Sequence, residues 1–310
     1  MEFGKLETVE GVDWTLPVVS EKTVQYLNHY LSGSLSRSLS ERKLDLRFGT
    51  PAWAHREWVG KIYPKGCKPT DFLQHYSKQY GAIEFNSSHY QIPTLQQTTK
   101  WLEKVPSHFL FCPKVYQGIS HAAQGLQNSV LLKSWVGFLE RLGANCGPCF
   151  LQLPPFFDYK RKTELHHFLK QWPRDFELAI EFRHPSWFEN GSVLPMLSEY
   201  LFQRGIGTVI TDVSGRRDVL HSSVTSDFTI VRFIGNSLHE SDTVRMQLWG
   251  ERLKQLRENG LSRVFLFVHQ PDDILCPEMT NIAVDILNQK MGLKLKPVGA
   301  EAPMDLLSLH

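Results

Sequence analysis

Eight short apolar runs of four or five residues recur along the chain, and segments with helical periodicity separate most of them. This alternation is typical of βα units with parallel strands buried on both faces. The runs are Leu46–Gly49, Ala82–Asn86, Phe109–Pro113, Phe150–Leu153, Leu178–Phe182, Thr208–Thr211, Thr229–Phe233 and Val264–Val268. Eight such units predict a (β/α)8 TIM-like barrel. A doubly wound open sheet is the alternative, because periodicity does not show closure.

Seven of the eight connections contain apolar residues at helical spacing. The predicted helices are Thr70–Tyr80, Leu95–Lys104, Asn128–Leu142, Lys162–Gln171, Ser192–Arg204, Asp242–Arg257 and Pro277–Gln289. The connection Val213–Asp227 is predicted to be a loop, because Ser and Gly interrupt its pattern.

The chain is predicted to have three parts. Residues 1–43 form an N-terminal arm with an amphipathic helix, Glu21–Leu31, and a Ser-rich linker, Ser32–Ser38. Residues 44–292 form the barrel, and residues 293–310 form a C-terminal tail. We expect the arm to pack over one end of the barrel, and an oligomer contact or a lid is the alternative.

Composition excludes several classes of protein. The 310 residues include 34 Lys and Arg against 32 Asp and Glu, a net charge of +2, which excludes a polycationic nucleic-acid arm. No apolar segment approaches the roughly 18 to 20 residues that a membrane-spanning helix needs. An odd number of cysteines, five, argues against a disulfide framework. These observations predict a cytoplasmic protein in a reducing compartment, without a membrane partner.

The segment Cys146-Gly-Pro-Cys149 matches a redox dithiol, whose first thiol is normally activated at a helix N-terminus. Here an apolar stretch, Phe150–Leu153, and two prolines follow, which indicates a strand. We therefore interpret Gly-Pro as a turn before a buried strand, with two packed thiols beside it.

Polar residues gather at the predicted carboxyl ends of the strands, where barrel enzymes place their chemistry. Glu84, Glu181 and Arg232 lie inside otherwise apolar strands, and such charges are costly to bury unless they are paired. One interpretation is a structural ion-pair network. The other is a polar pocket in which carboxylates act as bases and Lys114, Arg183 and Arg232 hold an anionic group.

The second interpretation predicts an enzyme that acts on a small phosphorylated or carbohydrate-like anion by general acid/base chemistry. Glu84 or Glu181 would be the base, and His184 would assist proton transfer. The candidate catalytic residues are Glu84, Glu181, His184 and Asp212. The candidate ligand-binding residues are Trp53, Asn86, Tyr90, Lys114, His121, Gln152, Arg183, Trp187 and Arg232.

Two alternatives remain open. Glu181 and His184 are spaced so that both could bind one divalent metal ion, which would make the protein a metal-dependent hydrolase or isomerase that acts on a sugar or on abasic nucleic acid. A non-catalytic nucleic-acid or regulatory module would use the aromatic side chains for bases and the cations for phosphates, although the near-neutral charge does not favour it. No cofactor is predicted, since the sequence has no glycine-rich phosphate loop.

The strand-end residues also resemble a known family, the YecE-like proteins of domain-of-unknown-function family 72, over about residues 45 to 290. The segments that carry the resemblance are Gly49–Trp53, Trp58–Gly60, Tyr63-Pro64, Glu84–Tyr90, Trp101, Val105-Pro106, Lys114, Ile119–His121, Gln152–Pro155, Glu181–Trp187, Asp212 and Arg232–Gly235. The resemblance implies a TIM-like barrel and no established activity.

The chain departs from the family pattern at a few of these positions. Pro51-Ala52 stands where the family usually has Ser-Gly, His89 where it has an aromatic residue, and Ile234 where it has His. His269-Gln270 stands where the family usually has an Asn pair. Any family chemistry that needs an imidazole at position 234 is therefore not expected here.

Overall fold

A central parallel sheet organises the chain in the computed structural model, which describes residues 4–32 and 44–299. Six strands pair in the order β1-β10-β9-β8-β5-β4, and β2 pairs with β3 in a separate parallel ladder. The strands are β1 Asp45–Gly49, β2 Ala82–Phe85, β3 Leu110–Pro113, β4 Cys149–Gln152, β5 Leu178–Glu181, β8 Gly207–Asp212, β9 Phe228–Ile234 and β10 Arg263–His269. Each coincides with one of the eight apolar runs, so the strand predictions are confirmed.

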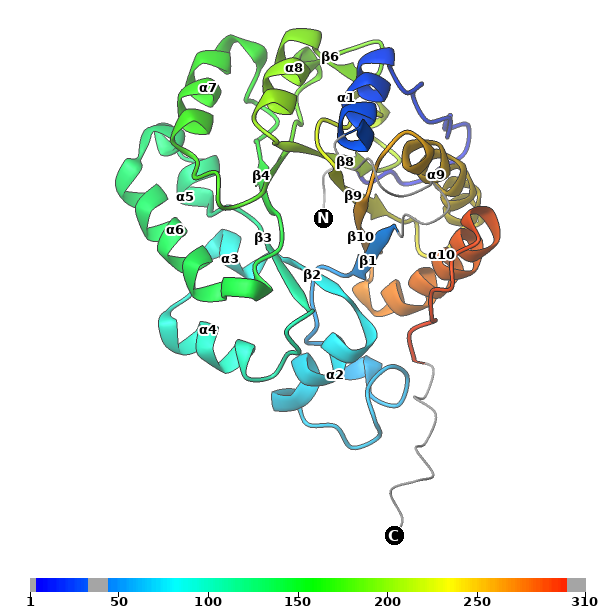
Figure 1. The fold of residues 1–310 in the computed structure, drawn as a ribbon. Helices are drawn as coiled ribbons and strands as arrows, with labels where there is room; N and C mark the ends of the chain where they lie inside the picture. The colour runs from blue at the N-terminus through cyan, green and yellow to red at the C-terminus, as the bar shows by residue number, and fades with distance from the viewer. Residues whose placement is uncertain (1–3, 33–43, 300–310) are drawn as a thin grey trace.

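Helices lie around the outside of these strands (Figure 1). They are α1 Glu21–Ser32, α2 Phe72–Gln79, α3 Ser87–Tyr90, α4 Leu95–Leu102, α5 Gln117–Ser120, α6 Ser129–Leu142, α7 Lys162–Gln171, α8 Pro195–Gln203, α9 Glu240–Glu258 and α10 Cys276–Met291. All seven predicted connecting helices are present, and so is the helix in the arm. No described helix combines the length and apolar composition needed to span a membrane.

Two connections differ in detail from a simple strand and helix alternation. The predicted helix Ser192–Arg204 begins only at Pro195, because Ser192–Val193 (β7) pairs antiparallel with Phe188–Glu189 (β6). The connection predicted to be a loop contains a short 3-10 helix, Arg217–Val219, and no α-helix.

The expected closed barrel is not confirmed, since the described strands form a mixed α/β fold with two separate parallel ladders. Between β1 and β2, Glu84 N donates to Thr50 O at 3.2 Å. Between β3 and β4, the isolated bridges Phe111↔Cys146 and Lys114↔Phe150 take the place of a continuous ladder. The Tyr76 hydroxyl lies between β1 and β2, since it accepts from Thr50 N at 2.8 Å and donates to Ala82 O at 3.2 Å. Pro113, which ends β3, has no N–H to donate to β4.

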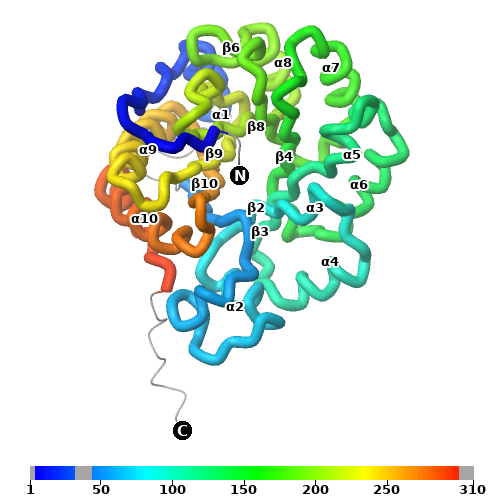
Figure 2. Tube along the Cα trace, turned by 180° about the vertical axis from the view of Figure 1, so that it is seen from behind, coloured from blue at the N-terminus to red at the C-terminus, as the bar shows by residue number. Residues whose placement is uncertain are grey.

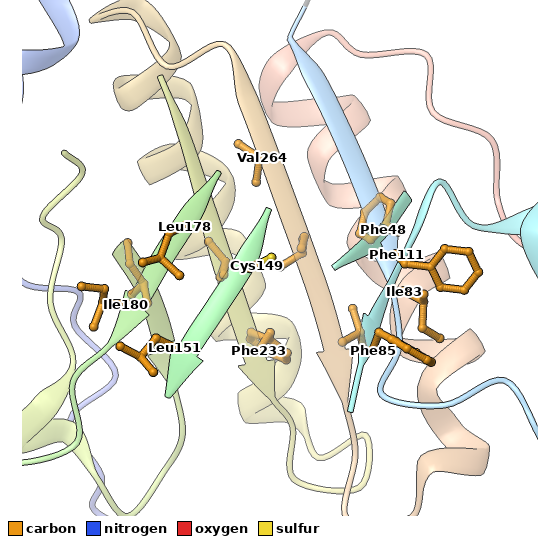
Figure 3. Close-up of a cluster of buried hydrophobic side chains, with 14 of the residues drawn as sticks. Phe48, Ile83, Phe85, Phe111, Cys149, Leu151, Leu178, Ile180, Phe233 and Val264 are labelled. Atoms are coloured by element: carbon orange, nitrogen blue, oxygen red, sulfur yellow. The ribbon is translucent and has the colours of Figure 1, made fainter. Parts of the chain in front are cut away.

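Apolar side chains pack on both faces of the strands. The larger cluster joins strand residues such as Phe85, Leu151 and Phe233 with the surrounding helices (Figure 3). A smaller cluster lies on the opposite, inner face and includes Phe150 and Ile230. The strands are therefore buried on both sides, as their continuous apolar sequences predict.

The N-terminal arm packs against the rest of the molecule along its described length. Gly215 N donates to Gly4 O at 2.9 Å, and the ring of Tyr26 stacks on Phe202 of α8 with centroids 4.4 Å apart. Figure 2 shows the first part of the arm passing beside α9. Most of the Ser-rich linker and residues 300–310 of the predicted tail lie outside the described residues, so the three-part division stays a prediction.

The Cys-Gly-Pro-Cys segment connects a 3-10 helix, Gly143–Asn145, to β4, which begins at Cys149. The five cysteines are free thiols. Gly147 packs closely here, because a Cβ at this position would lie 2.8 Å from Cys112 Sγ and 3.0 Å from Phe111 O. The turn interpretation is thus confirmed in its geometry.

We expect Gly147→Ala to lower the free energy of unfolding by about 1–3 kcal/mol, because the added methyl group overpacks this turn. Gly137→Ala is the matched control, since the nearest atom to a Cβ there is 3.9 Å away and alanine favours the α6 helix. Urea unfolding measures both. An unchanged free energy for Gly147→Ala would contradict the close packing.

Candidate active site

The inner face of the strands is apolar at one level and polar at the next. Residues two apart in a strand point to the same face. In seven strands, an apolar residue on the inner face is followed two positions later by a polar residue on that face. The pairs are Ala82 and Glu84, Cys112 and Lys114, Phe150 and Gln152, Ala179 and Glu181, Val209 and Thr211, Ile230 and Arg232, and Phe267 and His269. The polar members come from seven strands or their ends and form a layer above the smaller apolar cluster.

Arg232 is the centre of this polar layer and is fully buried. Its Nε and Nη2 donate to Glu84 Oε2 and Oε1, both at 2.9 Å. Its Nη1 lies 3.2 Å from both carboxylate oxygens of Glu181. One guanidinium of β9 therefore joins carboxylates of β2 and β5, which belong to different ladders.

Other side chains complete the hydrogen bonding of the two carboxylates. Glu181 accepts from Arg183 Nε at 2.8 Å, Gln152 Nε2 at 2.7 Å and Thr211 Oγ1 at 2.9 Å. Glu84 accepts from Asn86 Nδ2 at 2.9 Å, and its Oε2 lies 2.8 Å from His269 Nε2. The carboxylates are therefore held in fixed orientations by neighbours from several elements.

The arginines keep both carboxyl groups ionised despite their burial. Burial by itself raises the pKa of Glu84, but Arg232 and His269 outweigh it and hold that pKa well below its usual range. Burial likewise opposes the ionisation of Glu181, and Arg183 and Arg232 lower its pKa below the usual range. Both groups are consequently weak bases at neutral pH, which argues against the predicted general-base role.

Lys114 lies at the end of β3 and is only 8% exposed. Its backbone is fixed, since its N–H donates to Phe85 O at 3.2 Å and its carbonyl accepts from Ser88 Oγ at 2.9 Å. Within residues 4–32 and 44–299, no carboxylate oxygen lies within 4.0 Å of its ammonium. Burial, and then the charge of Arg232, lower the pKa of Lys114 to about 8.

The charge of Lys114 affects the pKa values of two histidines, His89 and His121. The rings of His89 and His121 are 5.0 Å apart, and burial followed by the charge of Lys114 lowers the pKa of each to about 4. His89 Nδ1 lies 2.8 Å from Val115 O, and a carbonyl only accepts, so Nδ1 carries the proton and Nε2 is an acceptor. Both imidazoles are therefore neutral at pH 7.

Several predicted site residues lie apart from this polar layer. Asp212 faces the helix side of β8, where it pairs with Arg217 and, at 2.9 Å, with Arg245, and accepts from Trp249 Nε1 at 2.7 Å. Trp187 is fully buried, and its Nε1 donates to Phe157 O at 2.7 Å. These two side chains have no surface for a ligand, so the structure places them in packing roles.

The remaining predicted residues have mixed surroundings. His184 caps a 3-10 helix, Pro185–Trp187, through its Nδ1, which accepts from Ser186 N at 3.2 Å. Trp53 stacks on Phe85 with ring centroids 5.9 Å apart, whereas Tyr90 is 68% exposed and contacts the edge of His89. The structure thus brings together Glu84, Asn86, Lys114, Gln152, Glu181, Arg183 and Arg232, with His121 beside Lys114.

A cavity of about 570 Å³ borders this layer on the side of β1, β8, β9 and β10. His269, which lines the cavity, links it to Glu84. The arm residues 4–10 form another part of its wall, together with Ser214 and Asp273. The sequence analysis did not predict Thr211 or arm residues 4–10 as part of the site. The only signal for Thr211 is that side chains alternate between the two faces of β8.

The arrangement gives no geometric support to a metal centre. In the part of the chain that the structure describes, no three His, Cys, Asp or Glu side chains gather as metal ligands. The oxygens of Glu181 accept hydrogen bonds from cations and neutral donors, and His184 Nδ1 lies 2.8 Å from Ser186 Oγ. The pairing of Glu181 with His184 around a divalent ion stays a prediction.

The polar layer contains several of the residues that carry the family resemblance. Comparison with known proteins identifies the family. The family described as "Protein of unknown function DUF72" matches residues 47–301. The chain belongs to the DUF72 family. It is 28% identical over 251 residues to the UPF0759 protein YecE of Escherichia coli K12, an alignment that covers 75% of this chain and 89% of that protein.

Crystal structures of DUF72 proteins support the fold. One from Enterococcus faecalis V583 has a TM-score of 0.64 at 16% identity and covers 83% of this chain and 99% of its own. One from Thermotoga maritima MSB8 has a TM-score of 0.62 at 21% identity and covers 79% of this chain and 98% of its own. The DUF72 name states no activity, so the chemistry follows from the site alone.

We expect Arg232→Met to lower the free energy of unfolding by about 3–5 kcal/mol, because it leaves two buried carboxylates without their shared cation. The loss should shrink at acidic pH, where those carboxyls can bind protons. Arg263→Met is the control, since Arg263 is 29% exposed and its ion pairs lie at the surface, where such pairs contribute about 0–1 kcal/mol. Equal losses in urea unfolding would contradict the role of Arg232.

Proposed function

We propose that this protein is an enzyme that acts on a small phosphorylated or carbohydrate-like anion, with Lys114 and Arg183 as the groups that bind the anion. The observation that carries the proposal is a charge imbalance. Glu84 and Glu181 supply two negative charges against three positive charges from Lys114, Arg183 and Arg232, and all five are at most 8% exposed. A buried excess of one positive charge is costly unless an anion occupies the site.

Arg232 and Lys114 differ in whether a carboxylate already pairs with their charge. Arg232 directs three of its nitrogens at Glu84 and Glu181, so its charge is already compensated. Lys114 has no carboxylate within 4.0 Å in the described residues, which leaves its ammonium for a ligand. This refines the predicted set of anion-binding groups, in which Arg232 becomes a positioning residue for the two carboxylates.

Lys114 is also the group whose protonation suits acid/base chemistry near neutral pH. A general acid or base works best when its pKa lies near the operating pH, and the pKa of Lys114 is lowered to about 8. The paired carboxylates are weaker candidates, because their pKa values are lowered. We therefore assign proton transfer to Lys114 in place of Glu84, Glu181 or His184.

The proposal also treats the eight parallel strands as a (β/α)8 arrangement with its site at the carboxyl ends of the strands. In support, Arg232 reaches Glu84 and Glu181 across two ladders, which requires β2, β5 and β9 to converge on one interior. The cavity of about 570 Å³ beside His269 has the size of a small-molecule site, but Lys114 and Arg183 are not among the residues that line it.

A ligand screen by thermal unfolding tests the function. Sugar phosphates, nucleotides, oligonucleotides, divalent metals and sulfate are each added to the full chain. A ligand at a hundred times its Kd stabilises the folded state by about 2.7 kcal/mol. We expect small anions to raise the Tm of the natural chain and not of Lys114→Met.

Two variants serve as controls in this screen. Lys114→Met should fold at least as stably as the natural chain, because it removes a buried ammonium, so a lost shift reports lost binding. Lys133→Met removes an exposed lysine of α6 and should keep the full response. A shift that survives in Lys114→Met, or a response only to oligonucleotides or metals, would refute the proposed function.

The affinity for sulfate should depend on pH in a defined direction. Sulfate keeps its charge between pH 6 and 10, while Lys114 is charged below its pKa of about 8 and neutral above it. We expect Kd to be constant at low pH and to rise up to about tenfold per unit above pH 8. Lys114→Arg should remove this rise, since arginine stays charged. Calorimetry measures both, and a pH-independent Kd in the natural chain would contradict the assignment.

A further inference from the structure

We propose that Lys114 is a covalent catalyst whose Nζ forms a Schiff base with the aldehyde or ketone carbon of an anionic substrate. This inference rests on the proposed function and deepens it, since it names the chemical class of the substrate. The substrate would carry a carbonyl group for Lys114 and a negatively charged group for Arg183.

The surroundings of Lys114 are those that a nucleophilic amine needs. A buried lysine in a structural role is normally paired with a carboxylate. Here Arg232 and Arg183 engage the nearby carboxylates, and no carboxylate oxygen of the described residues lies within 4.0 Å of the ammonium. Burial together with neighbouring cations favours the neutral amine, which is the form that attacks a carbonyl.

The amine is also held in place. Lys114 lies at the end of β3, where its backbone N–H and C=O are bonded to Phe85 and Ser88 and the residue bridges to Phe150 of β4. The smaller apolar cluster, including Cys112 two residues earlier, packs below it on the same face. A rigid strand end positions a reacting group better than a mobile loop.

The covalent step conserves atoms and charge. The neutral Nζ attacks the carbonyl carbon, and the C=O electron pair moves to oxygen, which takes up the proton that the nitrogen releases to give a neutral carbinolamine. The nitrogen lone pair then expels this oxygen as water after a second protonation, which leaves a protonated imine. Overall, a lysine ammonium and a carbonyl give an iminium ion and one water.

This product suits the charge balance of the site. The iminium retains the single positive charge that Lys114 contributes, so the excess over Glu84 and Glu181 persists while the substrate is bound. The neutral imidazoles of His89 and His121 lie in the field of Lys114 and are suited to relay the protons of the dehydration step. An iminium withdraws electrons from the adjacent carbon, and the site therefore favours bond cleavage or proton removal next to the former carbonyl.

Reductive trapping tests the amine directly. The folded full chain is treated with limiting formaldehyde and cyanoborohydride at pH 7.5, and methylation at each lysine is followed by peptide mass spectrometry. A pKa of about 8 against the ordinary 10.5 gives a neutral fraction up to about 300-fold larger than that of an exposed lysine. We expect Lys114 to be methylated at least tenfold faster than Lys133. An equal or slower rate at Lys114 would overturn the inference.

A second arm uses glyceraldehyde 3-phosphate, dihydroxyacetone phosphate and pyruvate as probes with borohydride. We expect one adduct per chain at Lys114, reduced by competing sulfate and absent from Lys114→Arg. That variant should still show the sulfate-dependent rise in Tm, because its charge is kept. A sulfate response without any adduct at Lys114 would overturn the covalent step and leave the proposed function standing, whereas loss of the sulfate response in the natural chain would refute both.

Discussion

The contact between Arg232 and two glutamates is the interaction on which the interior depends. Glu84 and Glu181 come from strands of separate ladders, and the guanidinium of β9 bonds to both within 3.2 Å. Removing three ionised groups from water is expensive, and only good geometry with full hydrogen bonding compensates for it. Arg183, Asn86, His269, Gln152 and Thr211 supply the remaining hydrogen bonds. The network is therefore cooperative, since each member orients a carboxylate that another member needs.

This network also determines the state of Lys114. If Arg232 were absent, the two carboxylates would be free to pair with the lysine and would raise its pKa. Because they are engaged by arginines, the lysine keeps a buried amine at the end of β3 that pairs with no carboxylate among the described residues. The two interpretations of the strand-end charges are thus compatible, since the structural ion pairs create the electrostatic conditions for a reactive group.

The sequence predicted the strands well, because each is a continuous apolar run that only burial on both faces explains. It also located the costly charges at Glu84, Glu181 and Arg232. The sequence could not show which face of its strand each residue occupies. A strand that is buried on both sides has no exposed polar face, so the alternation of its side chains does not distinguish inward from outward positions. Asp212 was therefore preferred to its neighbour Thr211, although Thr211 is the residue that bonds to Glu181. Closure was equally hidden, because hydrophobicity shows neither the Tyr76 hydroxyl that bonds to Thr50 N and Ala82 O between β1 and β2 nor the missing N–H donor of Pro113.

The part of the arm that lines the cavity has a practical consequence for work on this protein. Residues 4–10 contribute to the wall of the cavity beside His269, and Gly4 O accepts a hydrogen bond from Gly215 N. A substitution within residues 4–10 therefore alters that wall directly. At the other end, Gly299 N donates to Gln79 Oε1, and neither residue lines the cavity. A substitution at Gln79 or Gly299 therefore leaves the wall of this cavity unchanged.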